Sequence, residues 1–149
     1  MSNTILAAVD FSEVNPMVLT ETIEMARALQ CKVTLIHVVQ YMPETNLYEG
    51  EMILPDLPMQ EMLEENSEKL LKEAQLRVTN AGIDCDICLR DGSPAYEIME
   101  WIKENNPRLA VIGSHGHGAL YHLVLGSVSE KIIDKAKCPI LVVKLDTKY

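Results

Sequence analysis

The sequence has little positive charge for its size. Its 149 residues contain 13 Lys and Arg against 22 Asp and Glu, so the formal net charge is −9. A surface of this sign repels the phosphates of nucleic acids and anionic lipid headgroups, and we therefore expect neither a nucleic-acid nor a membrane partner. The charge does not exclude a small phosphate ligand, because backbone N–H groups can bind one locally.

Long apolar runs are also missing. No stretch approaches the roughly 18 apolar residues of a membrane-spanning helix. Residues Met1–Thr4 lack the basic segment, followed by an apolar one, that marks a secretory signal. A cytoplasmic location is the expectation, and the length predicts one domain over residues 1–149.

Cysteine is scarce, with four residues in the chain. Cys85 and Cys88 form a C-x-x-C pair, a spacing found in zinc and redox sites. Both fall in a predicted strand, where residues three apart point to opposite faces. Buried, unpaired thiols are therefore the favoured interpretation.

Apolar runs and helical periodicities alternate along the chain. Strands are predicted at Thr4–Val9, Lys32–Val39, Ile83–Arg90, Leu109–Ile112 and Pro139–Lys144. Helices are predicted between them, at about Asn15–Gln30, Met59–Ala81 and Ser93–Asn105, and from Ser127 onward. The segment Tyr41–Pro58 has no clear period and is interpreted as an insertion. This order predicts an α/β fold with an open parallel sheet and helices on both faces.

Apolar residues at helical spacing indicate which helix faces are buried. In the second helix the predicted buried side consists of Met62, Leu63, Leu70, Ala74 and Val78, and in the fourth of Val128, Ile132, Ile133 and Ala136. The eight methionines fit core packing better than a binding surface. The glutamates of the second helix are interpreted as its solvated face.

Glycine gathers in one stretch, Gly113-Ser114-His115-Gly116-His117-Gly118, and Gly126-Ser127 follows shortly after. Ser127 and Glu130 fit a capping box, which predicts that a helix starts at Ser127. A glycine loop and a helix N-terminus both present unpaired N–H groups, and the helix end adds a positive dipole. Together they predict an anion site, most often for phosphate.

Asp10 follows the first predicted strand, as Gly113 follows the fourth. Ligands of open parallel sheets bind beyond the carboxyl ends of the strands, where strand order reverses. If these strands are neighbours, a carboxylate able to bind ribose or adenine faces the amide-rich loop, which predicts a nucleotide site. Asp10 also fits a simple turn, and Ser129 an ordinary first-turn serine.

The histidines suggest no separate site. His37 lies in an apolar strand and fits a hydrogen-bonded core histidine. His115 and His117 form an H-x-H pair, but no third ligand lies nearby in the sequence, so no metal site is predicted.

The spacing Gly113-x2-Gly116-x9-Gly126-Ser127 resembles the G-x2-G-x9-G-[S/T] signature of the nucleotide-binding branch of the universal stress protein family. The similarity covers nearly the whole chain. Four further stretches resemble, in order, the family's opening strand and turn, its second strand, the start of its third helix and its last strand: Ile5–Ser12, Leu35–Val39, Asp91–Pro94 and Cys138–Val143.

The resemblance implies a five-stranded sheet of order 3-2-1-4-5 that binds ATP, with Mg or Mn held through the phosphates. Ala8, Asp10 and Val38 would border adenine and ribose. The phosphates would lie along Gly113, Ser114, Gly116, His117, Gly118 and Ala119, closed over by Gly126, Ser127, Val128 and Ser129. Family members often carry Arg or Lys where this chain has His117, which gives a terminal phosphate less charge, so AMP is an alternative ligand. The family also implies a homodimer through the last strand, Ile140–Lys144.

Three functions stay open. The first is an ATP-binding regulatory protein of the stress response with little or no turnover, since the sequence offers no clear general base, phosphate-clamping lysine or arginine finger. The second is a slow ATPase or an autophosphorylating enzyme that uses Ser127 or Ser129 as acceptor. The third is a ligand-free interaction module.

Overall fold

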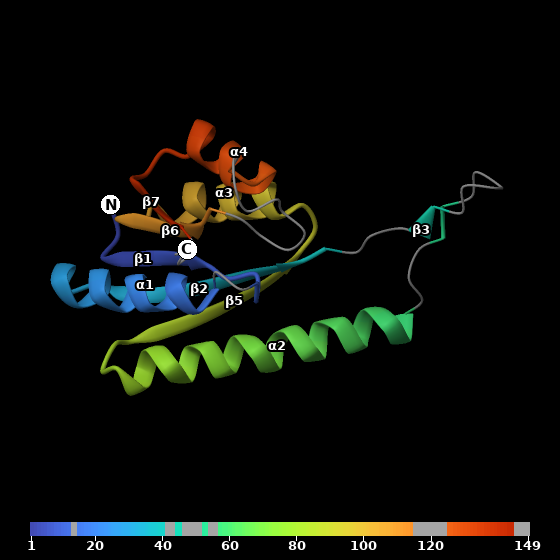
Figure 1. Ribbon diagram of the computed structural model, residues 1–149, viewed down its shortest axis with the longest axis horizontal. Coiled ribbons are helices and arrows are strands. Elements are labelled where there is room, and N and C mark those ends of the chain that lie inside the picture. The colour runs from blue at the N-terminus through green and yellow to red at the C-terminus, as the bar shows by residue number, and fades with distance from the viewer. Residues whose placement is uncertain (13–14, 41–43, 46–51, 54–56, 115–124, 145–149) are drawn as a thin grey trace, which may run out of the picture.

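The computed structural model describes residues 1–12, 15–40, 44–45, 52–53, 57–114 and 125–144. Its helices and strands alternate through most of the chain (Figure 1). In chain order they are β1 (Thr4–Ala8), α1 (Asn15–Leu29), β2 (Lys32–Val39), β3 (Glu44–Thr45), β4 (Met52–Ile53), α2 (Leu57–Asn80), β5 (Cys85–Asp91), α3 (Pro94–Asn105), β6 (Leu109–Gly113), α4 (Ser127–Lys135) and β7 (Ile140–Val143).

Five strands form a parallel sheet in the order β5-β2-β1-β6-β7. Counted along the main sheet alone, this is the predicted order 3-2-1-4-5, which is confirmed. β1 therefore lies between β2 and β6, and strand order reverses on either side of it. Because all five strands run the same way, the residues that follow β1, β2 and β6 meet at one edge of the sheet.

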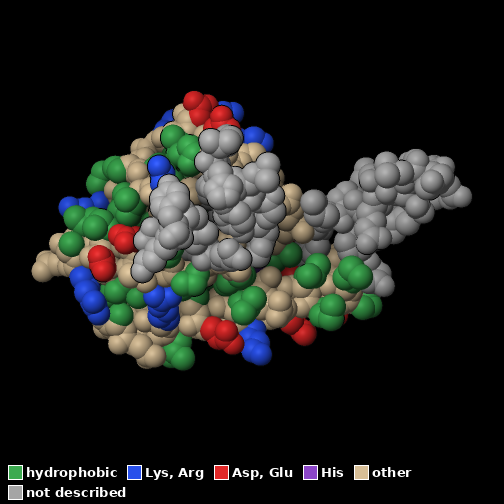
Figure 2. Space-filling model, in the orientation of Figure 1, with side chains coloured by type: hydrophobic (Ala, Val, Ile, Leu, Met, Phe, Trp, Pro, Cys, Tyr) green, Lys and Arg blue, Asp and Glu red, His purple; other side chains and the backbone are tan. Residues whose placement is uncertain are grey.

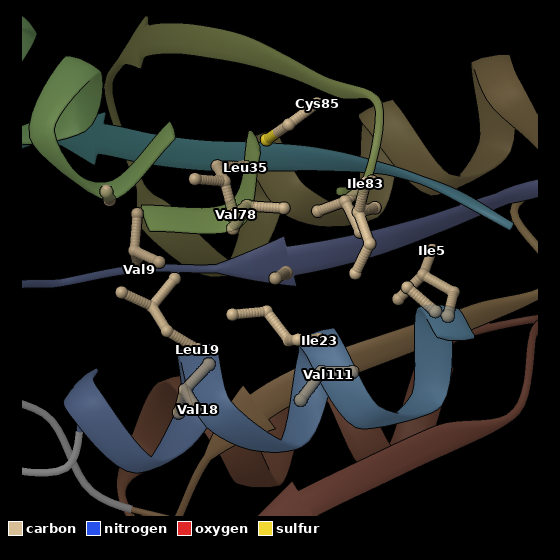
Figure 3. Packing of buried hydrophobic residues seen from close by; sticks show 14 of the residues in the cluster. Ile5, Val9, Val18, Leu19, Ile23, Leu35, Val78, Ile83, Cys85 and Val111 are labelled. Atoms are coloured by element: carbon tan, nitrogen blue, oxygen red, sulfur yellow. The ribbon is translucent and has the colours of Figure 1, made fainter. Parts of the chain in front are cut away.

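Helices cover both faces of the sheet, as predicted (Figure 1). α1 and α2 pack on one face, in a cluster that includes Leu19, Ile23 and Val78 (Figure 3). α3 and α4 pack on the other, through residues such as Trp101 and Ile132. The central strand β1 is almost wholly buried, as expected for a strand covered from both sides.

Three helix ends follow local chemistry. Pro94 opens α3, where its fixed φ suits the first turn and its missing N–H costs nothing. Asn106 closes α3 in the left-handed region with φ 44°, and its N–H donates to Ile102 O. Gly82 follows α2 with φ 82°, a left-handed conformation that suits glycine, and α2 ends at Asn80, one residue before the predicted end at about Ala81.

Several predicted boundaries are wrong by one to a few residues. β1 ends at Ala8, although the Val9 N–H still donates to Ile36 O. β5 runs from Cys85 to Asp91, whereas the strand was predicted over Ile83–Arg90. β3 and β4 pair antiparallel inside the segment predicted to be irregular, and α2 begins at Leu57.

The predicted capping box at Ser127 is wrong. The N-cap of α4 is Gly126, with φ −60° and ψ 153°, and it makes no side-chain cap hydrogen bond. Its carbonyl accepts the Glu130 N–H, which closes the first helical turn. Ser127 is thus the first helical residue, one position too late for its hydroxyl to cap the helix.

The predicted buried faces of α2 and α4 need correction. In the C-terminal half of α2, Leu71, Ala74 and Val78 are buried. In the N-terminal half, Met62 and Leu63 are 62% and 37% exposed. In α4, Ile132 is buried and Ile133 is exposed. Two methionines of α2, Met59 and Met62, are thus on the surface rather than in the core.

Candidate functional site

A cavity of about 850 Å³ opens at the carboxyl edge of the sheet. β1, β2 and β6 supply its floor, and the first turn of α4 supplies one wall. The predicted site residues that line it are Ala8, Asp10, Val38, Gly113, Gly126, Ser127, Val128 and Ser129. This volume lies within the range of small-molecule sites, roughly 300–1,000 Å³.

The remaining predicted site residues are not among the described residues that line the cavity. Ser114 is buried, and it is absent from the described residues that line the cavity. Its N–H donates to Val143 O at 2.8 Å, so the ladder with β7 continues one residue past β6. Gly116, His117, Gly118 and Ala119, as well as His115, lie outside the described residues.

Asp10 shapes the turn after β1. Its Oδ1 accepts the Ser12 N–H at 3.0 Å and the Ser12 hydroxyl at 2.6 Å. The turn role foreseen for an aspartate is therefore real, and the same side chain also lines the cavity. Among the described residues of the lining, Asp10 is the one acidic side chain, and none is Lys or Arg.

His37 and Phe11 were not predicted as site residues. His37 Nδ1 lies 2.7 Å from Val9 O, and its ring is 4.6 Å from that of Phe11, at an interplanar angle of 44°. His37 is hydrogen-bonded, as predicted, but it is half-buried at the cavity wall rather than in the core. The position of His37 near the end of β2 was the available signal, because the ends of the central strands form the floor.

The backbone at the start of α4 supplies amides toward the cavity. The Gly126 N–H is already used, since it donates to Ser114 O at 2.8 Å. The N–H groups of Ser127, Val128 and Ser129 come before the first intrahelical bond, which runs from Glu130 to Gly126. The helix dipole adds positive potential at the same place. This wall suits an anion even though the described lining holds no cationic side chain.

Ser129 connects α4 to β6. Its hydroxyl is buried and donates to Gly113 O at 2.7 Å. The bond satisfies a carbonyl at the end of β6 and holds the first turn of α4 beside that strand. It also occupies the hydroxyl that an autophosphorylation reaction at this residue would need.

Replacing Ser129 with Ala is expected to lower the free energy of unfolding by roughly 1–2 kcal/mol, because the Gly113 carbonyl loses its donor. Urea unfolding checks the value. Ser127→Ala is the matched control, because Ser127 lies two residues before Ser129 and its side chain is exposed. This variant should change the free energy of unfolding little. Equal losses in both variants would contradict the bridging role of Ser129.

α2 forms a further wall that sequence reasoning missed. Leu63, Asn66, Ser67 and Leu70 line the cavity from the N-terminal half of this helix. The helix was interpreted only through its buried and solvated faces. No local motif reveals that its first half reaches the carboxyl edge of the sheet, because that depends on helix length and packing.

The cysteines form no second site. Cys85 packs in the cluster under α1 and α2, and Cys88 packs against the cluster under α3, so the two point to opposite faces as predicted. Burial, with smaller effects from Asp86 and Asp84, raises the pKa of the Cys85 thiol to about 12. All four cysteines are free thiols. Within the described part of the chain no three His, Cys, Asp or Glu side chains gather as metal ligands.

None of the helices in the described ranges is both long and apolar enough to cross a bilayer.

Solved structures share this fold. The protein MJ0577 superposes with a TM-score of 0.79 at 26% identity, covering 99% of both chains. Two more distant matches were solved as nucleotide complexes. A universal stress protein from Archaeoglobus fulgidus bound to dAMP has a TM-score of 0.67, 22% identity and coverage of 95% and 97%. A universal stress protein bound to cAMP has a TM-score of 0.68, 20% identity and coverage of 95% of each chain. At these identities the two complexes support the fold alone.

Relatives align along nearly the whole chain. Universal stress protein YxiE of Bacillus subtilis is 29% identical over 148 residues, covering 97% of this chain and all of the relative. Universal stress protein MJ0531 of Methanocaldococcus jannaschii is 32% identical over 145 residues, covering 97% of this chain and 83% of the relative. The model of the universal stress protein family matches residues 1–144. This chain therefore belongs to the universal stress protein family.

Proposed function

We propose that this chain binds ATP, with AMP as the alternative, in the cavity at the carboxyl edge of the sheet. The observation that carries the proposal is the juxtaposition of Asp10 with the first turn of α4 across one cavity. Adenine and ribose would lie near Ala8, Asp10 and Val38, over a floor that is mainly apolar. Two universal stress proteins of the same fold were solved with cAMP and with dAMP, and we extend the adenine nucleotide to this chain as part of the proposal.

The phosphates would lie at the amides of Ser127 and Val128, and Gly116, His117, Gly118 and Ala119 remain part of the proposed phosphate loop. Amides and a helix dipole hold an anion without cationic side chains. The described residues of the lining include no Lys or Arg. A divalent ion, Mg or Mn, would therefore neutralise the negative charge of the phosphates.

Little or no turnover is the second element of the proposal. Phosphoryl transfer needs a positioned base or water and stabilisation of the charge that develops on the phosphate. In the described lining, Asp10 is engaged with Ser12 and no cationic side chain is available. A regulatory protein of the stress response that retains its nucleotide fits this composition better than a rapid ATPase.

A slow autophosphorylating enzyme is the alternative, and one observation favours it. Ser127 is exposed and lines the cavity, so its hydroxyl is the acceptor that an ATP bound there would meet. Incubation with γ-labelled ATP and Mg²⁺ or Mn²⁺ separates the two functions. We expect intact ATP to be retained, whereas label that enters the native protein and not Ser127→Ala would establish the enzyme.

A homodimer through β7 completes the proposal. β7 is the last strand of the sheet order, so its outer side can pair with a second copy. Three of its four residues are only half-buried in the single chain.

Replacing Asp10 with Ala is expected to weaken ATP binding about 10-fold or more, because a hydrogen bond from ribose or adenine to a carboxylate is lost. Equilibrium dialysis or calorimetry measures the affinity. Ser12→Ala is the control: it removes the 2.6 Å hydroxyl contact and keeps the carboxylate. If both variants bind equally weakly, Asp10 acts through the turn and not on the ligand.

A further inference from the structure

The N-terminal half of α2 carries three exposed apolar side chains, and of these Leu63 alone lines the cavity of the proposed nucleotide site. Met59 is 49% exposed and Met62 is 62% exposed, and Leu63 beside them is 37% exposed. None of residues 58–70 is buried, in contrast to the C-terminal half of the same helix. Figure 1 shows this end of α2 running past the carboxyl ends of the strands.

These side chains form one continuous surface, which we name the α2 apolar face: Met59, Met62 and Leu63. Residues three and four apart lie side by side on a helix, so Met59 lies next to both Met62 and Leu63. In the space-filling view, hydrophobic side chains gather over this end of α2 (Figure 2). Methionine is flexible and polarisable, and surfaces rich in it adapt to the apolar sides of partner helices.

Acidic residues predominate around the α2 apolar face, and the first cation of the helix is Lys69, seven residues after Met62. Residues 57–68 contain four glutamates, Glu61, Glu64, Glu65 and Glu68, and neither Lys nor Arg. Glu65 stands three residues after Met62, so its carboxylate lies next to the apolar surface. A segment that covers this face must therefore bring apolar residues at its centre and positive charge at its rim.

We propose that the α2 apolar face docks a basic amphipathic helix of a partner protein. Its apolar side would cover Met59, Met62 and Leu63, and its Lys or Arg residues would face Glu61 and Glu65. This mode is the helix-in-groove recognition of an amphipathic segment by an adaptable apolar surface. A second copy of this chain fits less well, because the same acidic segment would meet itself.

The test uses the full-length protein without nucleotide, so its outcome is independent of the ATP proposal. The probe is a synthetic amphipathic peptide, Leu-Lys-Lys-Leu-Leu-Lys-Leu repeated twice, labelled for fluorescence anisotropy. We expect saturable binding that weakens about 10-fold or more in the double variant Met59→Gln, Met62→Gln, since apolar surface is lost from the contact. Glutamine keeps the helix propensity of methionine, so the variant should unfold at the native temperature.

Leu76→Gln is the matched control, because Leu76 is 59% exposed on the same helix but outside the α2 apolar face. It should bind the probe as the native protein does. A peptide with Glu in place of Lys should not bind. An equal loss of peptide affinity in Leu76→Gln, or native peptide affinity in the double variant, would show that the peptide does not bind at the α2 apolar face. Either result would overturn the proposal. A change of oligomeric mass in the double variant would assign the face to a second copy and would also overturn it.

Discussion

Replacing Ser127 with Asp is expected to weaken ATP binding by roughly 100-fold or more while the protein stays folded. Two like charges about 4 Å apart repel by roughly 1–4 kcal/mol for each pair, depending on the local dielectric constant, and ATP places several negative charges at this wall. The same carboxylate at the first helical residue of α4 interacts favourably with the helix dipole, by about 0.3–1 kcal/mol. Affinity and thermal stability should therefore change in opposite directions.

Isothermal titration calorimetry with ATP and Mg²⁺, together with thermal unfolding of the apo protein, measures both quantities. Ser127→Asn is the matched control, because Asn has nearly the shape of Asp without its charge and should bind ATP within a few-fold of the native protein. Native affinity in Ser127→Asp would place the phosphates away from the start of α4. A loss shared equally by Asn and Asp would indicate a steric effect instead of an electrostatic one.

Replacing Val142 with Pro is expected to convert the proposed homodimer to a monomer. In the β6–β7 ladder the Ala110 N–H donates to Pro139 O and the Ser114 N–H donates to Val143 O. Backbone groups alternate along a strand, so Val142 directs its N–H and C=O away from β6 and toward the side where a second copy would pair. Proline removes this one N–H and is tolerated on an edge strand, so the ladder with β6 is kept.

Light scattering after size-exclusion chromatography gives the oligomeric mass of each variant. Val142→Thr keeps the N–H and a β-branched side chain, and it should remain dimeric. Val142 pairs with Ile112 of the cavity lining, but no residue of β7 lines the cavity itself, so ATP affinity in Val142→Pro should stay within a few-fold of the native value. A dimer that survives the proline would mean that the copies associate through another surface.

Much of the fold could be predicted because its signals are local. Strands such as Thr4–Ala8 are apolar on both sides since helices cover both faces, and that composition is visible in the sequence. The C-x-x-C pair was interpreted correctly for a similar reason: strand periodicity alone sends Cys85 and Cys88 to opposite faces. Sheet order came from the family resemblance, because alternation of elements does not choose among parallel topologies.

The errors arise where the deciding interaction is tertiary. Ser127 has the right neighbour for a capping box, but the Gly126 N–H is held by Ser114 O, and the helix then begins with Gly126 as its cap. Met62 has the spacing of a core residue, yet it is 62% exposed, because this end of α2 runs past the carboxyl ends of the strands (Figure 1). Periodicity identifies which residues share a face and not whether another element lies opposite that face.

The residues of the candidate site likewise fall into those that the sequence predicts and those that depend on tertiary packing. Residues at the strand ends, such as Asp10 and Val38, were predicted because topology alone brings them to one edge. Ser114 was included with the glycine loop, but its N–H continues the β6 ladder and it is buried. Leu63 and Ser67 were missed because they reach the cavity from a helix distant in sequence.

The most direct test of the nucleotide account is to titrate ¹⁵N-labelled protein with ATP and, separately, with adenosine, and to follow the backbone amides by NMR. Both ligands should shift the resonances of residues near Asp10 and Val38. ATP alone should shift the amides of Ser127, Val128 and Ser129, since they precede the first intrahelical bond of α4 and would meet the phosphates. If ATP leaves these three amides unchanged at saturation, or if no titration perturbs the cavity, the account is contradicted.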